Sequence, residues 1–254
     1  MDHLSIEQLK QIPWNKKYVS GSDVPPEPES EEVPGLLKIP FMKRDSCYLQ
    51  FYTWHEIIKL VGIKPLKVLD AACGRGQICQ ILKFYDHDIT GADIEDCFSA
   101  DADIPFMQAN LDLDFPFADK SFDVVINSTA LLYLKSSEHF FIETKRILKP
   151  AGRIIFSITN IGNIGFRYYF LKTGEFSDYS NDILSRKNFL YPDYIFKLLD
   201  SLGFKVNTIV PTAPIVNFKL KIVDFFLGKI LFSGSKNNRK WKYSNSLIIE
   251  AIKT

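Results

Sequence analysis

The segment 67–77, with the sequence KVLDAACGRGQ, constrains the fold of this chain more than any other stretch. Its apolar start predicts a short buried strand, its glycines predict a sharp turn, and the residues after them predict a helix. Gly74 and Gly76 suit a turn that bends the backbone sharply and that a ligand approaches without meeting a Cβ atom. After the first parallel strand of an open α/β sheet, such a turn lies where nucleoside ligands bind. We therefore expect a cofactor site at this turn.

The spacing of the acid and the glycines separates two classes of nucleoside ligand. A dinucleotide fingerprint reads G-x-G-x-x-G after the strand, whereas this chain reads D-x-x-x-G-x-G, and Cys79 occupies the place of the third glycine. A carboxylate at the end of the strand suits a ligand with an ammonium group and a sulfonium charge, and it would repel a pyrophosphate. Asp70 therefore favours S-adenosylmethionine.

Four segments downstream of the turn carry a resemblance to a known family. They are DITGADI at 88–94, FMQANL at 106–111, FPFADKSFDVV at 115–125 and RILKPAGR at 146–153. Together with the glycine turn, they resemble the class I S-adenosylmethionine-dependent methyltransferases, in the small-molecule branch of type 11 and 12, from about Val68 to Thr159. The resemblance implies an α/β fold with a doubly wound, Rossmann-like sheet of seven strands, mostly parallel, with an antiparallel last strand.

The resemblance also implies which residues hold S-adenosylmethionine. Asp93 takes the place of the acid that binds the ribose hydroxyls, about 20 residues beyond the glycine turn. Asn110 stands where the family usually has an Asp that accepts a hydrogen bond from the adenine amine, and an Asn carbonyl oxygen can accept the same bond. The full set of implied cofactor-binding residues is Asp70, Ala72, Gly74, Gly76, Asp93, Ile94, Asn110, Leu111 and Asn127.

Each of these segments alone also has a purely structural interpretation. The glycine turn could bend the chain without a ligand, Asp93 could cap a helix, and Phe122 with Asp123 could pack the sheet and close a turn. The occurrence of all the segments in the family's order and spacing favours the cofactor site.

The acceptor side shows the largest departures from the family. The segment 128–134, STALLYL, resembles the start of the family's helix after the fourth strand, but Tyr133 replaces the usual His. We take Tyr133 as the candidate catalytic residue. A Tyr with a pKa of about 10 mostly forms hydrogen bonds, whereas a His with a pKa near 6.5 can act as a base. Farther on, 157–167 resembles a segment of methyltransferases found beside sugar genes, and Asn188 stands where those relatives have a His.

The histidines His3, His55, His87 and His139 are expected outside the acceptor pocket, with His87 and His139 facing solvent. An aliphatic hydroxyl normally needs a strong base, whereas an acidic oxygen or a free amine does not. The sequence therefore favours a phenol, carboxylate, phosphate or amine as acceptor, and O-methylation over N- or C-methylation. Aromatic residues such as Phe166, Tyr168 and Tyr169 could line an apolar pocket.

Length and composition limit the class of protein. A chain of 254 residues that is 46% hydrophobic can bury a full core. Its formal net charge of +1 argues against a broad surface for nucleic acid. The four cysteines have neither metal-site spacing nor a disulfide framework, so no metal is expected and a cytoplasmic location fits. The start at 1–10 is charged and amphipathic, so we expect no signal peptide, and charged residues interrupt the longest apolar stretch, so we expect no spanning helix.

We expect two parts in the chain. Residues 1–61 form an N-terminal cover, with a segment rich in Pro, Glu and Ser at 20–34 and a helix at 48–61 against the sheet edge. The cover, over 14–40, is expected to close on bound ligands. Residues 62–254 form the methyltransferase domain, with an insertion on the substrate side at about 160–191. Helices are expected at 78–85 and 194–202, and the last two strands at 204–210 and 247–252.

The segment 215–232 combines apolar residues at helical spacing with lysines. It is either an ordinary helix that packs on the domain or a basic amphipathic helix that contacts a membrane surface or a lipid-linked acceptor.

Three functions remain open at this point. The first is a methyltransferase for a small molecule. The second is an inactive binding or sensor protein of the same fold, which the loss of both expected histidines supports. The third, an RNA or protein methyltransferase, is disfavoured by the neutral charge and by the lack of an Asn-Pro-Pro-Tyr type motif.

Overall fold

The computed structural model of the chain describes residues 46–98, 103–174, 190–214, 222, 224–225 and 241–254. Three expectations from the sequence lie outside the described residues. They are the cover over 14–40, the stretch that contains Asn188, and nearly all of the amphipathic segment 215–232.

Seven strands form one mixed sheet. They are β1 (Lys67–Ala71), β2 (Asp88–Asp93), β3 (Phe106–Gln108), β4 (Phe122–Asn127), β5 (Leu148–Thr159), β6 (Phe204–Pro214) and β7 (Ser244–Lys253). The strand order is β3-β2-β1-β4-β5-β7-β6, and β7 runs antiparallel to both of its neighbours. This arrangement confirms the predicted fold class. β6 and β7 are longer than expected, because their pairing continues to Pro214 and Ser244.

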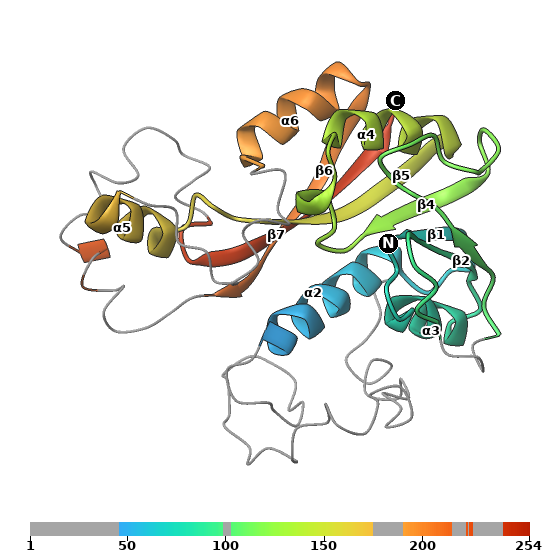
Figure 1. The fold of residues 1–254 in the computed structure, drawn as a ribbon, viewed down its shortest axis with the longest axis horizontal. Coiled ribbons are helices and arrows are strands. Elements are labelled where there is room, and N and C mark those ends of the chain that lie inside the picture. The colour runs from blue at the N-terminus through green and yellow to red at the C-terminus, as the bar shows by residue number, and fades with distance from the viewer. Residues whose placement is uncertain (1–45, 99–102, 175–189, 215–221, 223, 226–240) are drawn as a thin grey trace, which may run out of the picture.

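The helices cover both faces of the sheet, as Figure 1 shows. α2 (Ser46–Val61) and α3 (Gln77–Phe84) lie on one face, and α4 (Ser137–Ile147) and α6 (Pro192–Ser201) lie on the other. α5 (Ile164–Thr173) stands beyond the carboxyl end of β5, and the short 3₁₀ helix η1 (Leu131–Tyr133) follows β4. The expected helices begin and end within two residues of α2, α3 and α6.

α2 packs on the face of the sheet against β5, β7 and the edge strand β6, so it covers the edge that the sequence suggested and extends over the neighbouring strands. Ile57, Ile58 and Val61 bury their side chains there. Arg153 of β5 donates from Nη2 to the carbonyl of Val61 at 3.0 Å, and it pairs with the buried Glu250 of β7 at 3.2 Å. The helix end is therefore fixed by a side chain from the centre of the sheet.

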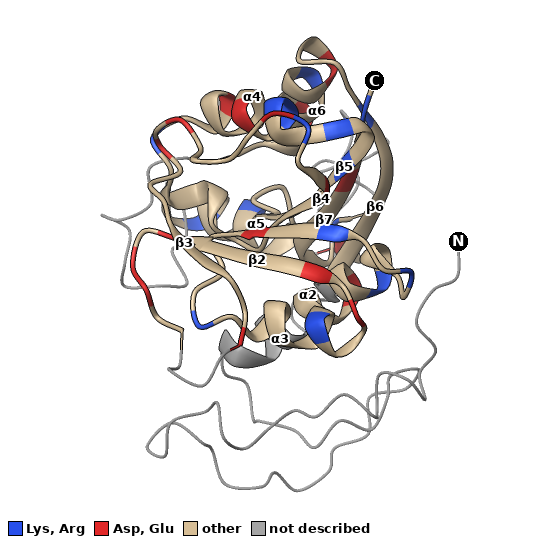
Figure 2. Ribbon diagram, turned by 90° about the vertical axis from the view of Figure 1, so that its right-hand side faces the viewer, with Lys and Arg blue, Asp and Glu red and all other residues tan. Residues whose placement is uncertain are grey.

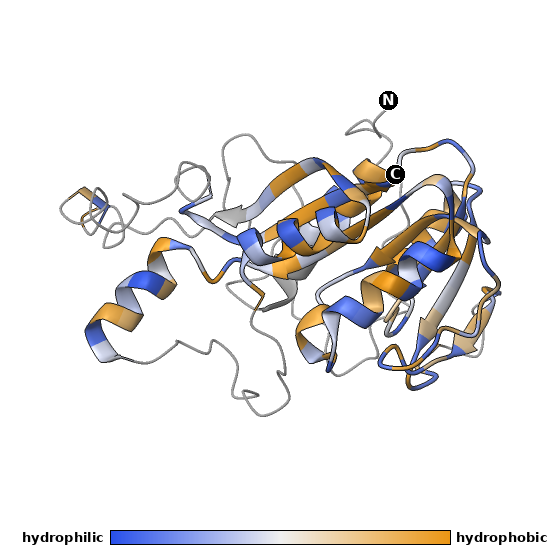
Figure 3. Cartoon of the chain, turned by 90° about the horizontal axis from the view of Figure 1, so that it is seen from above, coloured by the Kyte–Doolittle hydropathy of each residue, from blue (hydrophilic) through white to orange (hydrophobic). Residues whose placement is uncertain are grey.

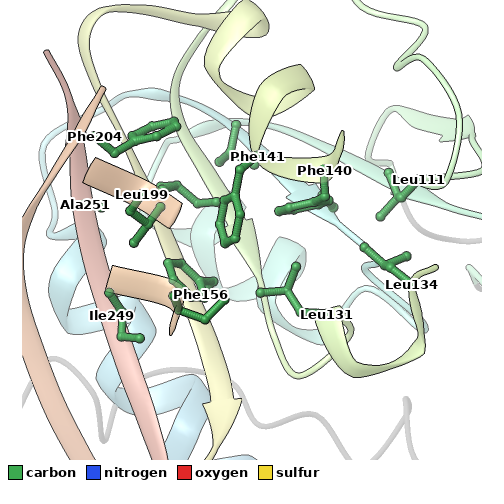
Figure 4. Packing of buried hydrophobic residues seen from close by; sticks show 14 of the residues in the cluster. Leu111, Leu131, Leu134, Phe140, Phe141, Phe156, Leu199, Phe204, Ile249 and Ala251 are labelled. Carbon is green, nitrogen blue, oxygen red and sulfur yellow. The ribbon is translucent and has the colours of Figure 1, made fainter. Parts of the chain in front are cut away.

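A phenylalanine layer fills the space between the sheet and α4, as Figure 4 shows. Phe140 and Phe141 of α4 and Phe156 of β5 are fully buried. Their rings meet edge to face, with centroids 5.6 Å apart between Phe140 and Phe141 and 5.2 Å apart between Phe141 and Phe156. Figure 3 shows the matching pattern, with apolar strands between helices whose outer faces are polar. Aromatic rings in this geometry add to the stabilisation from burial alone.

One side chain, Arg146 at the end of α4, joins the segments 115–125 and 146–153. Its guanidinium donates from Nη2 to the carbonyl of Phe115 at 2.9 Å and from Nη1 to that of Phe117 at 2.8 Å. It also pairs with Glu143 at 2.7 Å, and Glu143 in turn accepts from the Phe115 amide at 2.8 Å. Arg146 therefore holds the loop that enters β4 against the helix that precedes β5.

We expect Arg146→Ala to lower the free energy of unfolding by about 3 kcal/mol, because it removes several charge-assisted bonds and leaves the Glu143 carboxylate buried without its partner. Arg146→Lys should lose most of this energy too, since an ammonium cannot reproduce the planar fork. Urea unfolding measures both, with Lys197→Ala on the exposed face of α6 as the control. A loss below about 1 kcal/mol in Arg146→Ala would contradict this interpretation.

His87 is buried, so the prediction that it faces solvent is wrong. The ring lies at the amino edge of the sheet, where Nδ1 accepts from the Leu66 amide at 3.2 Å and Nε2 donates to the Gly62 carbonyl at 3.0 Å. Burial lowers the pKa of His87 below its ordinary value of 6.5. The ring is therefore neutral and bridges both ends of the α2–β1 connection.

The free energy of unfolding should fall as the pH drops below about 6.5, because the unfolded chain then binds a proton on His87 that the folded chain excludes. The slope from this one group cannot exceed about 1.4 kcal/mol per pH unit. The contribution of His87 is the difference between the pH dependence of the free energy of unfolding in the wild type and in His87→Gln, measured between pH 7 and 5. Parallel pH profiles for the two proteins would rule this role out.

Candidate functional site

The turn after β1 is held from β2. Ala72 has a φ of +71°, a left-handed conformation that residues other than glycine rarely adopt. The amides of Ala72 and Cys73 both donate to the carbonyl of Ala92, at 2.8 and 3.1 Å. Ala92 thereby fixes the direction in which the chain leaves β1.

The two glycines of the turn serve different purposes. Gly74, with a φ of +53°, has open space where a Cβ would stand, so a ligand could approach the main chain there. Gly76 has a φ of +75°, and a Cβ at this position would lie 2.1 Å from the ring of Phe98. Gly76 is therefore required by Phe98, whereas Gly74 faces the open side of the site.

Asp93, at the end of β2, is joined directly to the glycine turn. Its Oδ2 accepts from the Gly74 amide at 2.8 Å, and its Oδ1 accepts from the Ile94 amide at 2.7 Å. The next side chain, Ile94, is 57% exposed. A carboxylate and an exposed apolar side chain thus lie beside the open face of the turn.

Asp70, at the carboxyl end of β1, is a buried carboxyl. Only 1% of its surface is exposed, its Oδ2 accepts from the Cys79 thiol at 3.4 Å, and its Oδ1 is buried without a hydrogen-bond partner. Burial raises the pKa of Asp70 to about 7, and the charge of Asp93 acts in the same direction, while the Cys79 hydrogen bond opposes them. An unpartnered buried carboxyl oxygen is costly unless a cationic group binds it.

The other predicted cofactor residues lie in different surroundings. Asn110 is exposed after β3, and its Oδ1 accepts from the Asp112 amide at 3.0 Å. The Leu111 side chain is buried in the phenylalanine layer, so it would meet a ligand through its main chain. Asn127 is fully buried, and its side chain bonds the main chain of Ala71 and Ala130.

The acceptor side begins at the carboxyl end of β4. Tyr133 lies on η1 and is 42% exposed. Thr129, also left-handed with a φ of +68°, has its Oγ1 3.1 Å from Oγ of Ser157 on β5. Among the described side chains, no group of three or more His, Cys, Asp and Glu residues is placed to hold a metal ion.

Sequence reasoning missed three features of this site. One is the ring of Phe98 against Gly76, and another is the hydrogen bond from Cys79 to Asp70. The third is the left-handed Ala72, where the sequence shows no glycine to indicate it. A signal existed for Cys79, because one helical turn after the glycines returns its side chain toward the strand end.

The comparisons with known proteins agree with this geometry. Residues 69–156 match the model of a family described as a methyltransferase domain. A sterol 24-C-methyltransferase of Gibberella zeae is 34% identical over 39% of this chain and 29% of its own length, and a demethylmenaquinone methyltransferase of Thermotoga maritima is 29% identical over 61% and 77%. The crystal structure of a Burkholderia thailandensis 1,6-didemethyltoxoflavin N1-methyltransferase with bound S-adenosylhomocysteine has a similar fold, at a TM-score of 0.52 and 16% identity over 80% of this chain and 76% of that one.

Residues 69–156 thus form a domain of the methyltransferase family, and the strand order is that of the class I S-adenosylmethionine-dependent methyltransferases. S-adenosylmethionine is the cofactor of that family, as predicted. The match with the sterol relative spans less than a third of that relative's length. The activity of this chain and the identity of its methyl acceptor do not follow from these matches.

The raised pKa of Asp70 predicts that the binding of a cationic ligand to this carboxyl depends on pH. A cationic ligand binds the carboxylate, so the proton that occupies Asp70 in the free protein at pH 6 must leave on binding. We expect the affinity for S-adenosylmethionine to rise about tenfold from pH 6 to pH 8, with proton release near pH 7, which calorimetry in buffers of different ionisation enthalpy detects. Asp70→Asn should bind weakly and without this dependence. An equal pH dependence in both proteins would refute the role of Asp70.

Proposed function

We propose that this chain methylates a small molecule at an oxygen atom, with S-adenosylmethionine as the methyl donor. The observation that carries the proposal is the joined site at the ends of β1 and β2. There, Asp93 accepts from the Gly74 amide at 2.8 Å beside the buried, unpartnered Oδ1 of Asp70. The two acids differ in setting, because Asp70 is buried and Asp93 is half-buried, which suits a ligand with a cationic end and a ribose.

The residues fit the parts of the cofactor one by one. The Asp70 carboxylate would bind the ammonium group, Asp93 would bind the ribose hydroxyls, and the exposed Ile94 would pack on the adenine. Asn110 retains a free lone pair on Oδ1 beside its bond to Asp112 and can accept from the adenine amine. When bound, the cofactor supplies an electrophilic methyl group.

Alignment of the acceptor is the task that remains for the protein. In-line displacement gains much of its acceleration from holding the acceptor oxygen and the methyl group in line. The side chains at the ends of β4 and β5 are neutral, among them Ser128, Thr129 and Ser157. Of the described histidines, His87 lies at the opposite edge, His139 on α4 and His55 on α2. Without a His at the strand ends, an acidic oxygen such as that of a phenol is the acceptor we propose, with Tyr133 as its hydrogen-bond partner.

The surroundings suit a small acceptor with an apolar part. Tyr168 and Tyr169 are exposed on α5, beyond the carboxyl end of β5. In the view of Figure 2, Lys and Arg are interspersed with Asp and Glu along the described ribbon. The formal net charge of +1 also differs from the basic character that is typical of nucleic-acid-binding proteins. The relatives named above act, by their names, on a sterol and on demethylmenaquinone. Within the described residues, no helix combines the length and apolar character needed to cross a membrane.

The proposal is tested first at Asp93. We expect Asp93→Ala to weaken binding of S-adenosylmethionine at least about tenfold, because a lost charge-assisted hydrogen bond costs about 1.5 to 3 kcal/mol. Calorimetry measures the affinity. Asp88→Ala, at the other end of β2, is the matched control and should bind as the wild type does.

Turnover is tested separately. Extracts incubated with the protein and methyl-deuterated cofactor are examined by mass spectrometry for labelled products, and S-adenosylhomocysteine is measured. A labelled small molecule that depends on Asp93 supports the proposal. Binding without any labelled product would favour the inactive sensor, and labelled RNA or protein would favour the third function. Absence of binding by the wild type would remove the methyltransferase proposal itself.

A further inference from the structure

Two left-handed residues flank the point where the strand order reverses. Ala72 follows β1 with a φ of +71°, and Thr129 follows β4 with a φ of +68°. This conformation is unfavourable for residues with a Cβ, and a β-branched residue adopts it least readily. Such conformations persist where surrounding contacts enforce them, and they cluster at functional sites.

Asn127, the last residue of β4, bonds the main chain on both sides of this point. Its Nδ2 donates to the Ala71 carbonyl at 2.9 Å, next to Ala72, and its Oδ1 accepts from the Ala130 amide at 3.2 Å, next to Thr129. The side chain is fully buried. If the Asn127 amide were flipped, its Oδ1 would face the Ala71 carbonyl and its Nδ2 would face the Ala130 amide. The two partners therefore fix the orientation of the side chain.

The Asn127 side chain continues the sheet where the main-chain pairing stops. The pairing of β1 with β4 ends at Asp70 and Ile126, and the bond from Asn127 to Ala71 takes the place of the next one. On its far side, the acceptor turn (residues 128–134) is anchored by Leu131 and Leu134, which Figure 4 shows in the phenylalanine layer. The cofactor turn and the acceptor turn thus share one buried amide.

We propose that Asn127 is a positioning residue that couples the two turns, so that a cofactor bound at Gly74 and Asp93 fixes the backbone that carries Tyr133. The inference rests on the proposed function, because it assigns the cofactor to the first turn and the acceptor to the second. In-line transfer depends on alignment between the two ligands, and a shared rigid contact supplies that alignment.

The test follows the amide of Ala130 by hydrogen exchange and by nuclear magnetic resonance during titration with S-adenosylhomocysteine. In the wild type, the ligand should slow exchange at Ala130, although it binds on the other turn. In Asn127→Asp, one carboxylate oxygen can still accept from the Ala130 amide, but the other oxygen would lie against the Ala71 carbonyl and repel it. We expect this variant to bind S-adenosylhomocysteine at least tenfold more weakly and to lose the response at Ala130. Asn127→Ala should behave in the same way.

The control separates coupling from general destabilisation. Leu199→Ala opens a gap under α6, outside both turns, and should lower the melting temperature while affinity and the Ala130 response stay as in the wild type. The inference is wrong if the Asn127 variants keep the affinity and the Ala130 response of the wild type. It is also wrong if ligand binding leaves hydrogen exchange at Ala130 of the wild type unchanged. This second outcome does not require that the variants fold. A wild type that does not bind S-adenosylhomocysteine would instead refute the proposed function.

Discussion

The constraint on which the rest of the structure depends is the place of β1 between β2 and β4. Both neighbours run parallel to β1, so three carboxyl ends meet and the chain leaves them in different directions. The main-chain groups at these ends cannot continue the sheet, and buried groups of this kind need partners. Ala92, Asp93 and Asn127 provide them for the turn after β1. The same bonds that satisfy the backbone therefore build the site.

Several groups of the candidate site lower the folding stability of the free protein. A buried carboxyl with an unpartnered oxygen and two left-handed residues with a Cβ all cost free energy in the free protein. The phenylalanine layer packs against Leu131 of the acceptor turn and supplies a rigid support. Protonation of Asp70 reduces the cost of its burial, and a cationic ligand would remove the remainder by giving the carboxylate a partner. Groups that cost folding free energy thus lie where a cofactor would bind.

The glycine turn and the strand-end acids could be predicted because short contiguous segments specify them, and the seven-stranded sheet with its antiparallel last strand could be predicted because the family resemblance implies it. Asp70 with Gly74 and Gly76 indicates one unit of strand, turn and helix without knowledge of distant partners. The burial of His87 could not be predicted from the sequence, because its hydrogen-bond partners Gly62 and Leu66 precede it by more than twenty residues. A single polar residue before a strand is more typical of the surface. The hydrogen bond between the Asn127 side chain and the Ala71 carbonyl could not be predicted either, since Ala71 is 56 residues away in the sequence.

The acceptor side depends on connections rather than on strands. β5 ends at Thr159, and β6 ends at Pro214 beside the start of β7 at Ser244, so the connections 160–191 and 215–243 both leave from the carboxyl edge. The strand ends there contribute small neutral side chains that can orient an oxygen but cannot select one acceptor among many. We therefore propose that selection of the acceptor comes from residues outside the strand ends, while the shared amide of Asn127 and the left-handed turns beside it align the reacting groups.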